Sequence, residues 1–163
     1  MKTTMKRAVH IDFHTMPKID DFGANYGPAD LAEMLSDAHV TYVNIFARCN
    51  IGFSYYPTKL GTMYPGITRD YLGEAIEELH KRNIGVTAYL NGGINHELMN
   101  HHQEFIKITK DGRLYDDVDK ATNHYFRMPC FNTGYREYLF AEIREIMEKG
   151  PDGIFVDCML PKP

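Results

Sequence analysis

Four stretches of the chain alternate between apolar and polar residues with the period of a β-strand, and three stretches between them carry apolar residues at helical spacing. The predicted strands cover Ala8–His14, Val40–Arg48, Ile84–Asn91 and Gly153–Asp157. The predicted helices begin near Pro28, near Thr68, and at Asn132 or Thr133, which are residue types typical of a first turn or a cap. The order β-α-β-α-β-α-β predicts parallel strands joined by right-handed crossovers.

The two faces of the predicted strands differ in composition. One phase of each strand is aliphatic and suits contact with the helices. The opposite phase is polar or aromatic toward the carboxyl end of each strand, with Asp12 and His14, Phe46 and Arg48, Tyr89 and Asn91, and Asp157. A doubly wound sheet is covered on both faces, whereas one strand phase of a (β/α)8 barrel faces the lumen, where catalytic groups lie at the carboxyl end. We therefore predict an α/β fold of the (β/α)8 TIM-barrel type, with a doubly wound sheet as the alternative.

The length limits how much of a barrel the chain can form. The chain has 163 residues, whereas a complete barrel needs eight strands and about 250 residues. Four parallel strands with three intervening helices correspond to the amino-terminal half of a barrel, and they leave two sheet edges and the lumen face open. We expect residues 1–163 to form a single partial TIM-barrel domain, either as a fragment or as a unit that pairs with a second copy or with the remainder of the barrel.

Two segments that follow strands are too long for simple connections. They run from Asn50 to Gly66 and from Gly92 to Asn132, and long loops inside a compact domain are usually functional. The second segment is expected to contain a short helix near Glu97–Glu104 and a turn at Lys110–Arg113. Because both segments follow strands, they are predicted to lie on the catalytic face.

Composition and charge exclude several function classes. The net charge is −4 and the 18 basic residues are spread along the chain, so no nucleic-acid partner is expected. No apolar run approaches 20 residues, so neither a membrane span nor export is expected. The three cysteines are far apart and are interpreted as reduced thiols of a cytoplasmic protein. The absence of Trp counts against a sugar site unless the 11 Tyr and 9 Phe residues supply the stacking surface.

Three polar residues alternate on the first predicted strand, namely His10, Asp12 and His14. They could hydrogen-bond a substrate, ligate zinc or manganese, or form a hydrogen-bonded core network. A metal site needs further ligands on other strand ends, and the sequence offers only Asp157 there. Substrate recognition is the preferred interpretation, and no metal or other cofactor is expected.

Other candidate residues have both a functional and a structural interpretation. Arg48 could bind a substrate hydroxyl or carboxylate, or it could pair with Asp157 or Asp12. Asp157 ends the fourth predicted strand, where catalytic acids of α/β enzymes lie, but Asp also caps turns and helices. Asn132 is either a helix cap or a sugar ligand. Cys158 has no base placed beside it by the sequence, so no nucleophilic thiol is expected.

Several motifs together resemble a known family. They are Val9–His14, Asn44–Arg48, Gly85–Leu90, Lys110–Arg113, Cys130–Tyr138 and Asp152–Asp157. The pattern resembles the "hypothetical glycosyl hydrolase" barrel domain of the α-L-fucosidases of glycoside hydrolase family 151, which are relatives of the family 29 fucosidases and of β-galactosidase-like barrels. The resemblance covers nearly all of this chain but only the amino-terminal half of that domain.

The resemblance implies a retaining mechanism in which Asp157 matches the nucleophile. Such a mechanism needs a second carboxyl group about 5–5.5 Å away as acid/base, and in the related enzymes this group comes from a later part of the barrel. Glu97 and Glu104 are the only nearby glutamates in a catalytic-face loop, and their spacing does not recommend them as substitutes.

By position, the substrate-contact candidates are His10, His14, Arg48, Tyr89 and Asn132, with Asp12 on the same predicted face. The resemblance thus implies hydrolysis of a terminal glycoside, with an α-L-fucoside favoured and a β-galactoside possible, and it implies that the isolated chain is inactive. Two alternatives stay open. One is a non-catalytic half-barrel that serves binding or assembly, and the other is a metal-dependent hydrolase of the amidohydrolase type.

Overall fold

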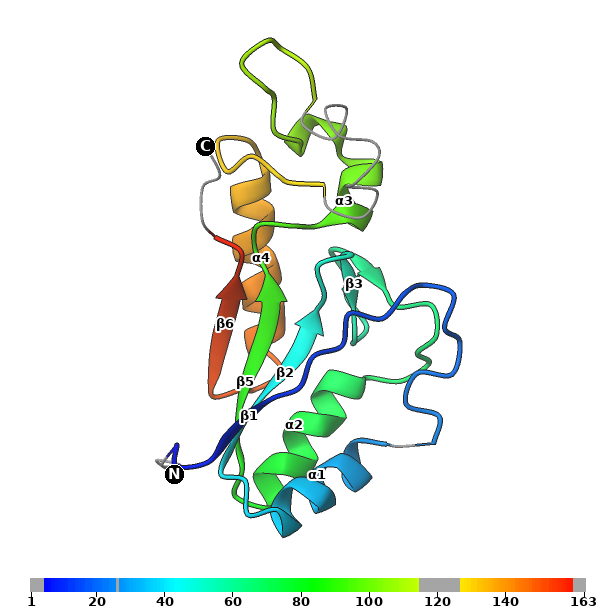
Figure 1. Cartoon of the computed structure of the whole chain (residues 1–163), viewed down its shortest axis with the longest axis vertical. Helices are drawn as coiled ribbons and strands as arrows, with labels where there is room; N and C mark the ends of the chain where they lie inside the picture. The colour runs from blue at the N-terminus through cyan, green and yellow to red at the C-terminus, as the bar shows by residue number, and fades with distance from the viewer. Residues whose placement is uncertain (1–4, 26, 115–126, 160–163) are drawn as a thin grey trace.

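The computed structural model describes residues 5–25, 27–114 and 127–159. Its main sheet contains four parallel strands that neighbour one another in chain order (Figure 1): β1 (Ala8–His10), β2 (Tyr42–Arg48), β5 (Gly85–Asn91) and β6 (Gly153–Asp157). The crossovers contain the helices α1 (Pro28–Asp37), α2 (Tyr71–Lys81) and α4 (Tyr135–Met147). The predicted alternation of four strands and three helices is confirmed.

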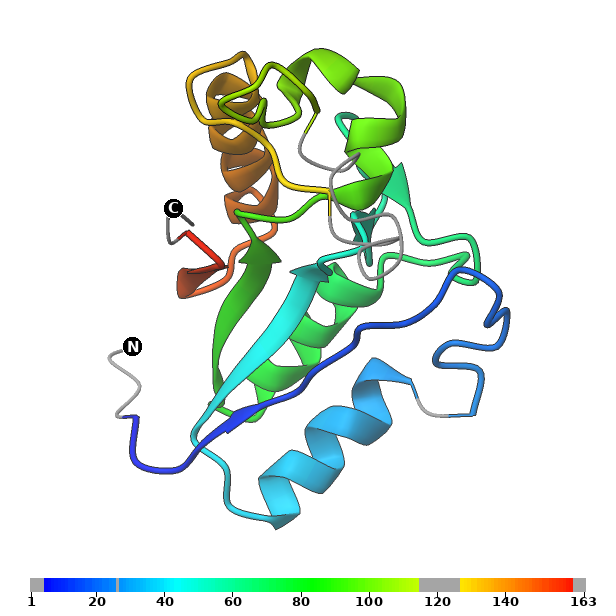
Figure 2. The same cartoon turned by 45° about the horizontal axis from the view of Figure 1, so that its top comes forward.

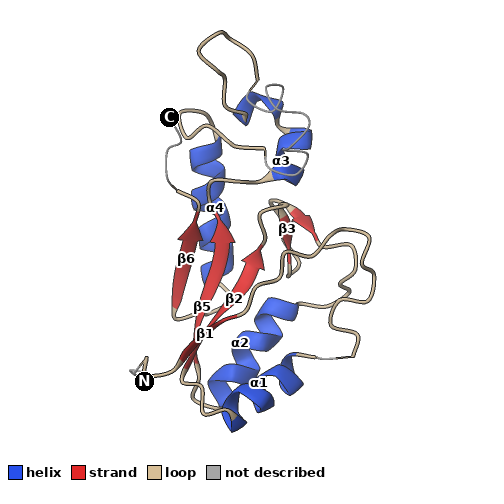
Figure 3. Ribbon diagram, viewed as in Figure 1, coloured by secondary structure: helices blue, strands red, loops and turns tan. Residues whose placement is uncertain are grey.

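The two long loops contain further elements, which Figure 3 distinguishes by colour. The first loop holds β3 (Phe53–Ser54) and β4 (Thr62–Met63), which extend the sheet beyond the end of β2. The second loop holds the α-helix α3 (His96–His101) and the 3-10 helix η1 (Gln103–Phe105) where one short helix was predicted. Two-residue strands have no periodicity, so the alternation pattern could not predict β3 and β4. Residues 115–126 of the predicted second loop lie outside the described ranges.

The first strand is shorter than predicted, because it ends at His10 instead of His14. The Ile11 N–H still donates to the Asn44 carbonyl at 2.9 Å, and the chain then leaves the sheet. Beyond this point β3 occupies the same edge of β2, where the Tyr55 N–H donates to the Ala47 carbonyl at 2.9 Å. The first strand therefore cannot continue along β2, because β3 already pairs with the rest of that edge.

One face of the sheet is covered by helices and the other is partly open. The aliphatic phase is fully buried at Val43, Ile45, Val86, Ala88 and Leu90, and α2 packs behind β2 and β5 (Figure 2). On the opposite face, Tyr42, Asn44 and Thr87 are only half-buried. Strands in chain order with one covered face do not match the doubly wound alternative, which covers both faces. The described strands do not close on one another, so a complete (β/α)8 barrel stays a prediction.

The helix caps differ from the predicted residues. Asp70, not Thr68, caps α2, because its Oδ1 accepts the Gly73 N–H at 2.9 Å. The preceding loop fixes this start, since the Leu72 N–H donates to the Tyr55 carbonyl at 3.0 Å. The cap position of α4 is Gly134, so Asn132 is not the cap. Within the described ranges, no helix combines the length and the apolar composition needed to cross a membrane.

Candidate active site

The site is built at the carboxyl ends of β5 and β6, where Tyr89 and Asp157 meet. The Tyr89 hydroxyl donates to Asp157 Oδ2 at 2.8 Å. The Cys158 backbone N–H donates to Asp157 Oδ1 at 2.7 Å, and Cys158 adopts a left-handed backbone conformation with φ of 58°. Such a conformation is uncommon for a residue with a side chain and is often found at functional sites. Both carboxylate oxygens are therefore held by donors, which fixes the orientation of the acid.

The chain segments that follow β5 and β6 approach each other closely. The Gly92 N–H donates to the Asp157 carbonyl at 2.8 Å. A Cβ atom on Gly93 would lie 1.7 Å from the Cys158 carbonyl oxygen, a separation that no pair of non-bonded atoms tolerates. Only glycine at position 93 allows this approach, and the approach places the residues that follow Asp157.

Aromatic rings form the floor beside the acid. The rings of Phe46 and Tyr89 stack with centroids 3.9 Å apart and an interplanar angle of 8°. The His10 ring meets both edge-on with centroids 5.7 Å away, and the His14 ring lies 5.0 Å from Phe46. His14 Nε2 also lies 3.2 Å from Asp12 Oδ1. The structure thus gathers the three polar residues of the first predicted strand, although only His10 is within the strand itself.

The electrostatics of the site keep Asp157 ionised. Burial raises the pKa of Asp157, but hydrogen bonds from Tyr89 and Cys158 and the nearby His14 outweigh burial, so the net pKa lies below the ordinary carboxyl value. Burial and the adjacent Asp157 both raise the pKa of Tyr89. The pair therefore consists of a carboxylate and a neutral phenol at neutral pH. A carboxylate with a lowered pKa is suited to act as a nucleophile or a charge stabiliser.

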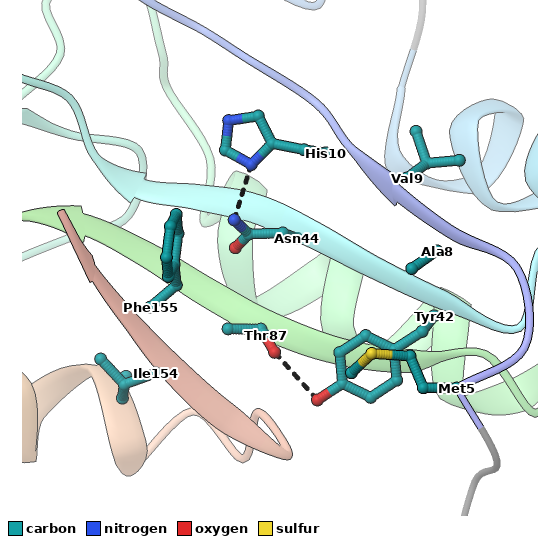
Figure 4. Close-up of a pocket in the computed structure, with 9 residues that line it drawn as sticks. All are labelled: Met5, Ala8, Val9, His10, Tyr42, Asn44, Thr87, Ile154 and Phe155. Carbon is teal, nitrogen blue, oxygen red and sulfur yellow. Dashed lines mark hydrogen bonds between the residues drawn. The ribbon is translucent and has the colours of Figure 1, made fainter.

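A hollow of about 580 Å³ lies on the same face of the sheet (Figure 4). Its lining includes His10, Asn44, Tyr42, Thr87 and Phe155. The Asn44 side-chain amide donates to His10 Nδ1 at 2.6 Å, and the Thr87 and Tyr42 hydroxyls are 2.9 Å apart. Because the Asn44 donor requires an unprotonated Nδ1, His10 Nε2 is left as the nitrogen able to donate outward.

Arg48 is not part of the site. Its side chain is fully buried, and its Nε donates to Glu142 Oε1 of α4 at 2.7 Å. The strand register explains the failed prediction, because Phe46 pairs with Tyr89 whereas Arg48 pairs with Leu90. One extra residue in β2 turns Arg48 to the helix-covered face. The predicted substrate contact and the predicted pairing with Asp157 or Asp12 are therefore both wrong.

The sequence contains a signal for the true partner of Arg48. Glu142 falls within the apolar stripe of α4, three residues after Leu139 and four before Ile146. A carboxylate at such a position needs a buried partner, and the buried Arg48 supplies it. Burial raises the pKa of Glu142, and Arg48 opposes this increase.

The remaining candidates have no contact with Asp157 among the described residues. Asn132 is exposed, and no hydrogen bond or ring contact found among the described residues joins it to Asp157. Glu97 lies 3.4 Å from His101, and Glu104 lies 2.9 Å from His102. Neither glutamate is placed against Asp157 by any such contact. Across the described ranges, no group of three or more His, Cys, Asp or Glu side chains is placed to hold a metal ion.

The sequence analysis placed Asn91 in the polar phase of its strand but did not include it among the candidate site residues. Its side chain is 2% exposed, and its Nδ2 donates to the Tyr89 hydroxyl oxygen at 3.1 Å. The signal was its position two residues after Tyr89, in the same phase of β5.

Comparisons with known proteins identify the family and the fold of this chain. The profile of a family described as "Hypothetical glycosyl hydrolase 6" matches residues 28–158. Among curated proteins, nothing matches. The α-L-fucosidase isoenzyme 2 from Paenibacillus thiaminolyticus is 29% identical with a TM-score of 0.86, over 98% of this chain and 24% of that protein. This chain therefore spans about a quarter of the length of that fucosidase.

Two more distant structures share the fold. A hypothetical protein from Ruminiclostridium thermocellum is 15% identical with a TM-score of 0.69, over 96% of this chain and 78% of that chain. The α-fucosidase from Thermotoga maritima is 22% identical with a TM-score of 0.61, over 90% of this chain and 32% of that chain. At these identities the likeness concerns the fold alone.

Proposed function

Because the chain belongs to the family described as hypothetical glycosyl hydrolase 6, we propose that it forms part of the catalytic domain of a retaining glycoside hydrolase with Asp157 as the nucleophile. The preferred substrate is a terminal α-L-fucoside, and a β-galactoside is the second choice. The proposal rests above all on one observation: Asp157 ends β6 with both carboxylate oxygens held by donors, beside Tyr89 and His14.

In this mechanism, an ionised oxygen of Asp157 attacks the anomeric carbon and forms a glycosyl-enzyme. The leaving oxygen takes a proton from a second carboxylic acid about 5–5.5 Å away. That acid then accepts a proton from water, which attacks the anomeric carbon and releases Asp157 as a carboxylate. We place this second acid outside residues 1–163, so the isolated chain should bind sugar weakly and should not turn it over.

We assign sugar binding to the residues around Asp157. His10, Asp12 and His14 offer hydrogen bonds to sugar hydroxyl groups, and His10 Nε2 points away from its bond with Asn44. The stacked rings of Phe46 and Tyr89 are 0% and 2% exposed, so they support the His10 and His14 rings from beneath and do not contact the sugar themselves. We assign the apolar contact to Phe155, which is 46% exposed and lines the hollow. Tyr89 acts as the donor to Asp157.

Binding of the free sugar tests the assignment on this chain. We expect α-L-fucose to shift the NMR signals of His14, Tyr89 and Asp157 with a dissociation constant in the millimolar range, and methyl β-galactoside to bind more weakly. Loss of one hydrogen bond in His14→Ala should weaken fucose binding about fivefold, which corresponds to about 1 kcal/mol. His102→Ala is the matched control, because His102 stacks on Phe105 in the second loop. Shifts confined to residues far from Asp157 would argue against the assignment.

The alternative of an assembly module is favoured by the open face of the sheet. Val9 of β1 is 38% exposed and Phe155 of β6 is 46% exposed, and both strands are edges of the parallel sheet within the described ranges. In a symmetric dimer, β6 of each chain can pair with β1 of the other chain, so that all four open edges are paired. We propose that this chain, when produced alone, forms a homodimer through these edges.

The molar mass in solution tests this closure. We expect sedimentation equilibrium to give the mass of a dimer, and Phe155→Lys to give a monomer, because a lysine would be buried in the shared lumen. Phe140→Lys is the control, since Phe140 is 49% exposed on α4. A wild-type chain that stays monomeric and soluble at high concentration would refute self-closure and leave the remainder of a barrel as the covering partner.

A further inference from the structure

Asn91 has a side-chain orientation that the surrounding backbone fixes. Its Oδ1 accepts the Ile94 backbone N–H at 2.9 Å. A backbone N–H can only donate, so the oxygen of the amide must face Ile94 and the NH₂ group must face the other way. Nδ2 then lies 3.1 Å from the Tyr89 hydroxyl oxygen and 3.4 Å from Cys158 Sγ. With 2% of its surface exposed, the side chain has no solvent to turn toward.

This orientation decides where the Tyr89 proton points. The hydroxyl group has one proton, and the Asn91 amide donates to its oxygen. The proton must therefore go to another acceptor, and Asp157 Oδ2 lies 2.8 Å away. The three hydrogen bonds have the same donor-to-acceptor direction: the Ile94 N–H donates to Asn91, Asn91 donates to Tyr89, and Tyr89 donates to Asp157.

We propose that Asn91 is a positioning residue, which acts on Asp157 through Tyr89 by making the Tyr89 hydroxyl an obligatory donor to Oδ2. We call the three hydrogen bonds that run from the Ile94 N–H through Asn91 and Tyr89 to Asp157 Oδ2 the relay. The Cys158 N–H donates to the other carboxylate oxygen, Oδ1, so each oxygen has its own fixed donor. The inference rests on the proposed function only where it treats Asp157 as the nucleophile. The bonds of the relay exist whatever the reaction is.

The relay has a consequence for protonation. The groups that face Asp157 are Tyr89 from β5, the N–H and thiol of Cys158, and His14, which is itself paired with Asp12. Donors to a carboxylate favour its charged form, which lowers the pKa. A lowered pKa in the folded state stabilises the protein above the ordinary carboxyl pKa, and this contribution is lost as the pH falls through the folded value. If an acceptor replaces the Asn91 donor, the Tyr89 hydroxyl no longer has to donate to Asp157, and the pKa of Asp157 should rise.

The Asn91→Asp variant of the full chain reverses the relay with almost no change in shape. Its Oδ1 can keep the Ile94 N–H, while an oxygen replaces Nδ2 and accepts the Tyr89 proton. Asp157 then loses a donor and gains a like charge nearby, so its pKa should rise by about 1 unit or more. The measurement is a pH titration of the Asp157 side-chain carboxyl carbon by ¹³C NMR, which needs no substrate.

Asn44→Asp is the matched control, because Asn44 lies on the same face of the sheet and donates to His10 Nδ1. The same substitution there should leave the midpoint of the Asp157 titration unchanged. A general effect of added negative charge on this face would move Asp157 in both variants. Equal shifts in the two variants would overturn the relay.

A second pair of variants covers the case in which Asn91→Asp does not fold. Tyr89→Phe removes the donor itself and should also raise the Asp157 midpoint, whereas Tyr42→Phe removes a hydroxyl that contacts Thr87 and should not. An Asp157 midpoint that is unchanged in Tyr89→Phe would overturn the proposal. Failure of this chain to bind α-L-fucose at the residues around Asp157 would refute the proposed function and would leave the titration result standing.

Discussion

The Glu142→Leu variant is expected to lower the free energy of unfolding by about 3–5 kcal/mol, because it leaves the buried Arg48 charge without its partner. Arg48 and Glu142 are 0% and 1% exposed, and the atoms that join them are 2.7 Å apart. Typical domains are stable by only about 5–15 kcal/mol. One substitution would therefore remove a large part of the total stability.

Urea unfolding followed by circular dichroism measures this effect. Glu148→Leu is the control, because Glu148 lies at the end of the same helix and is exposed; it should change stability by less than about 0.5 kcal/mol. The double variant Arg48→Met/Glu142→Leu should recover part of the loss, because it removes the unpaired charge but leaves the carbonyl groups of Asn91, Ile94 and Cys49 without their Arg48 donor. If Glu142→Leu alone unfolds like the wild type, the pair does not hold the fold together.

The same pair also supports the site. The Arg48 guanidinium donates to the carbonyl groups of Asn91, Ile94 and Cys49. Asn91 is the last residue of β5, and Ile94 and Cys49 lie just after β5 and β2. Asn91 is also part of the relay to Asp157. Arg48 thus acts on the site from the helix-covered face.

In a complete enzyme that contains this chain, Asp157→Gly is expected to lower kcat/KM for an aryl α-L-fucoside by roughly 10⁴-fold or more. The substitution removes the nucleophile, and no other described side chain takes its place between the Tyr89 hydroxyl and the Cys158 N–H. Azide is small enough to enter the vacated space and attack the anomeric carbon, so it should restore part of the activity. The product would be a fucosyl azide of inverted configuration.

Steady-state kinetics with and without azide measure this effect. Asp152→Asn is the control, because Asp152 lies just before β6 and accepts the Val86 N–H at 2.8 Å. It is an acid of the same segment at the opposite end of the strand, and its replacement should leave turnover near the wild-type rate. Normal turnover in Asp157→Gly would show that another residue is the nucleophile.

The sequence by itself determined the order of the elements and the composition of each face. Periods of two and of 3.6 residues depend on local geometry, so they predict strands and helices without knowledge of their neighbours. Parallel strands bring their carboxyl ends to one edge, and for this reason Tyr89, Asp157 and the polar residues of the first strand could be expected to meet. The structure brings Tyr89 and His14 to Asp157.

The tertiary structure alone decided which residues depart from the face or the strand that the alternation pattern predicts for them. The register shift in β2 depends on how β2 pairs with β5, and it turns Arg48 toward Glu142, 94 residues away. The first strand ends at His10 because β3, which has no periodic signal, takes its place beside β2. Asn91 and Gly93 acquire their roles from groups on other segments or from a close approach between loops. Alternation reports which face a residue prefers, whereas pairing between distant segments decides which face it occupies.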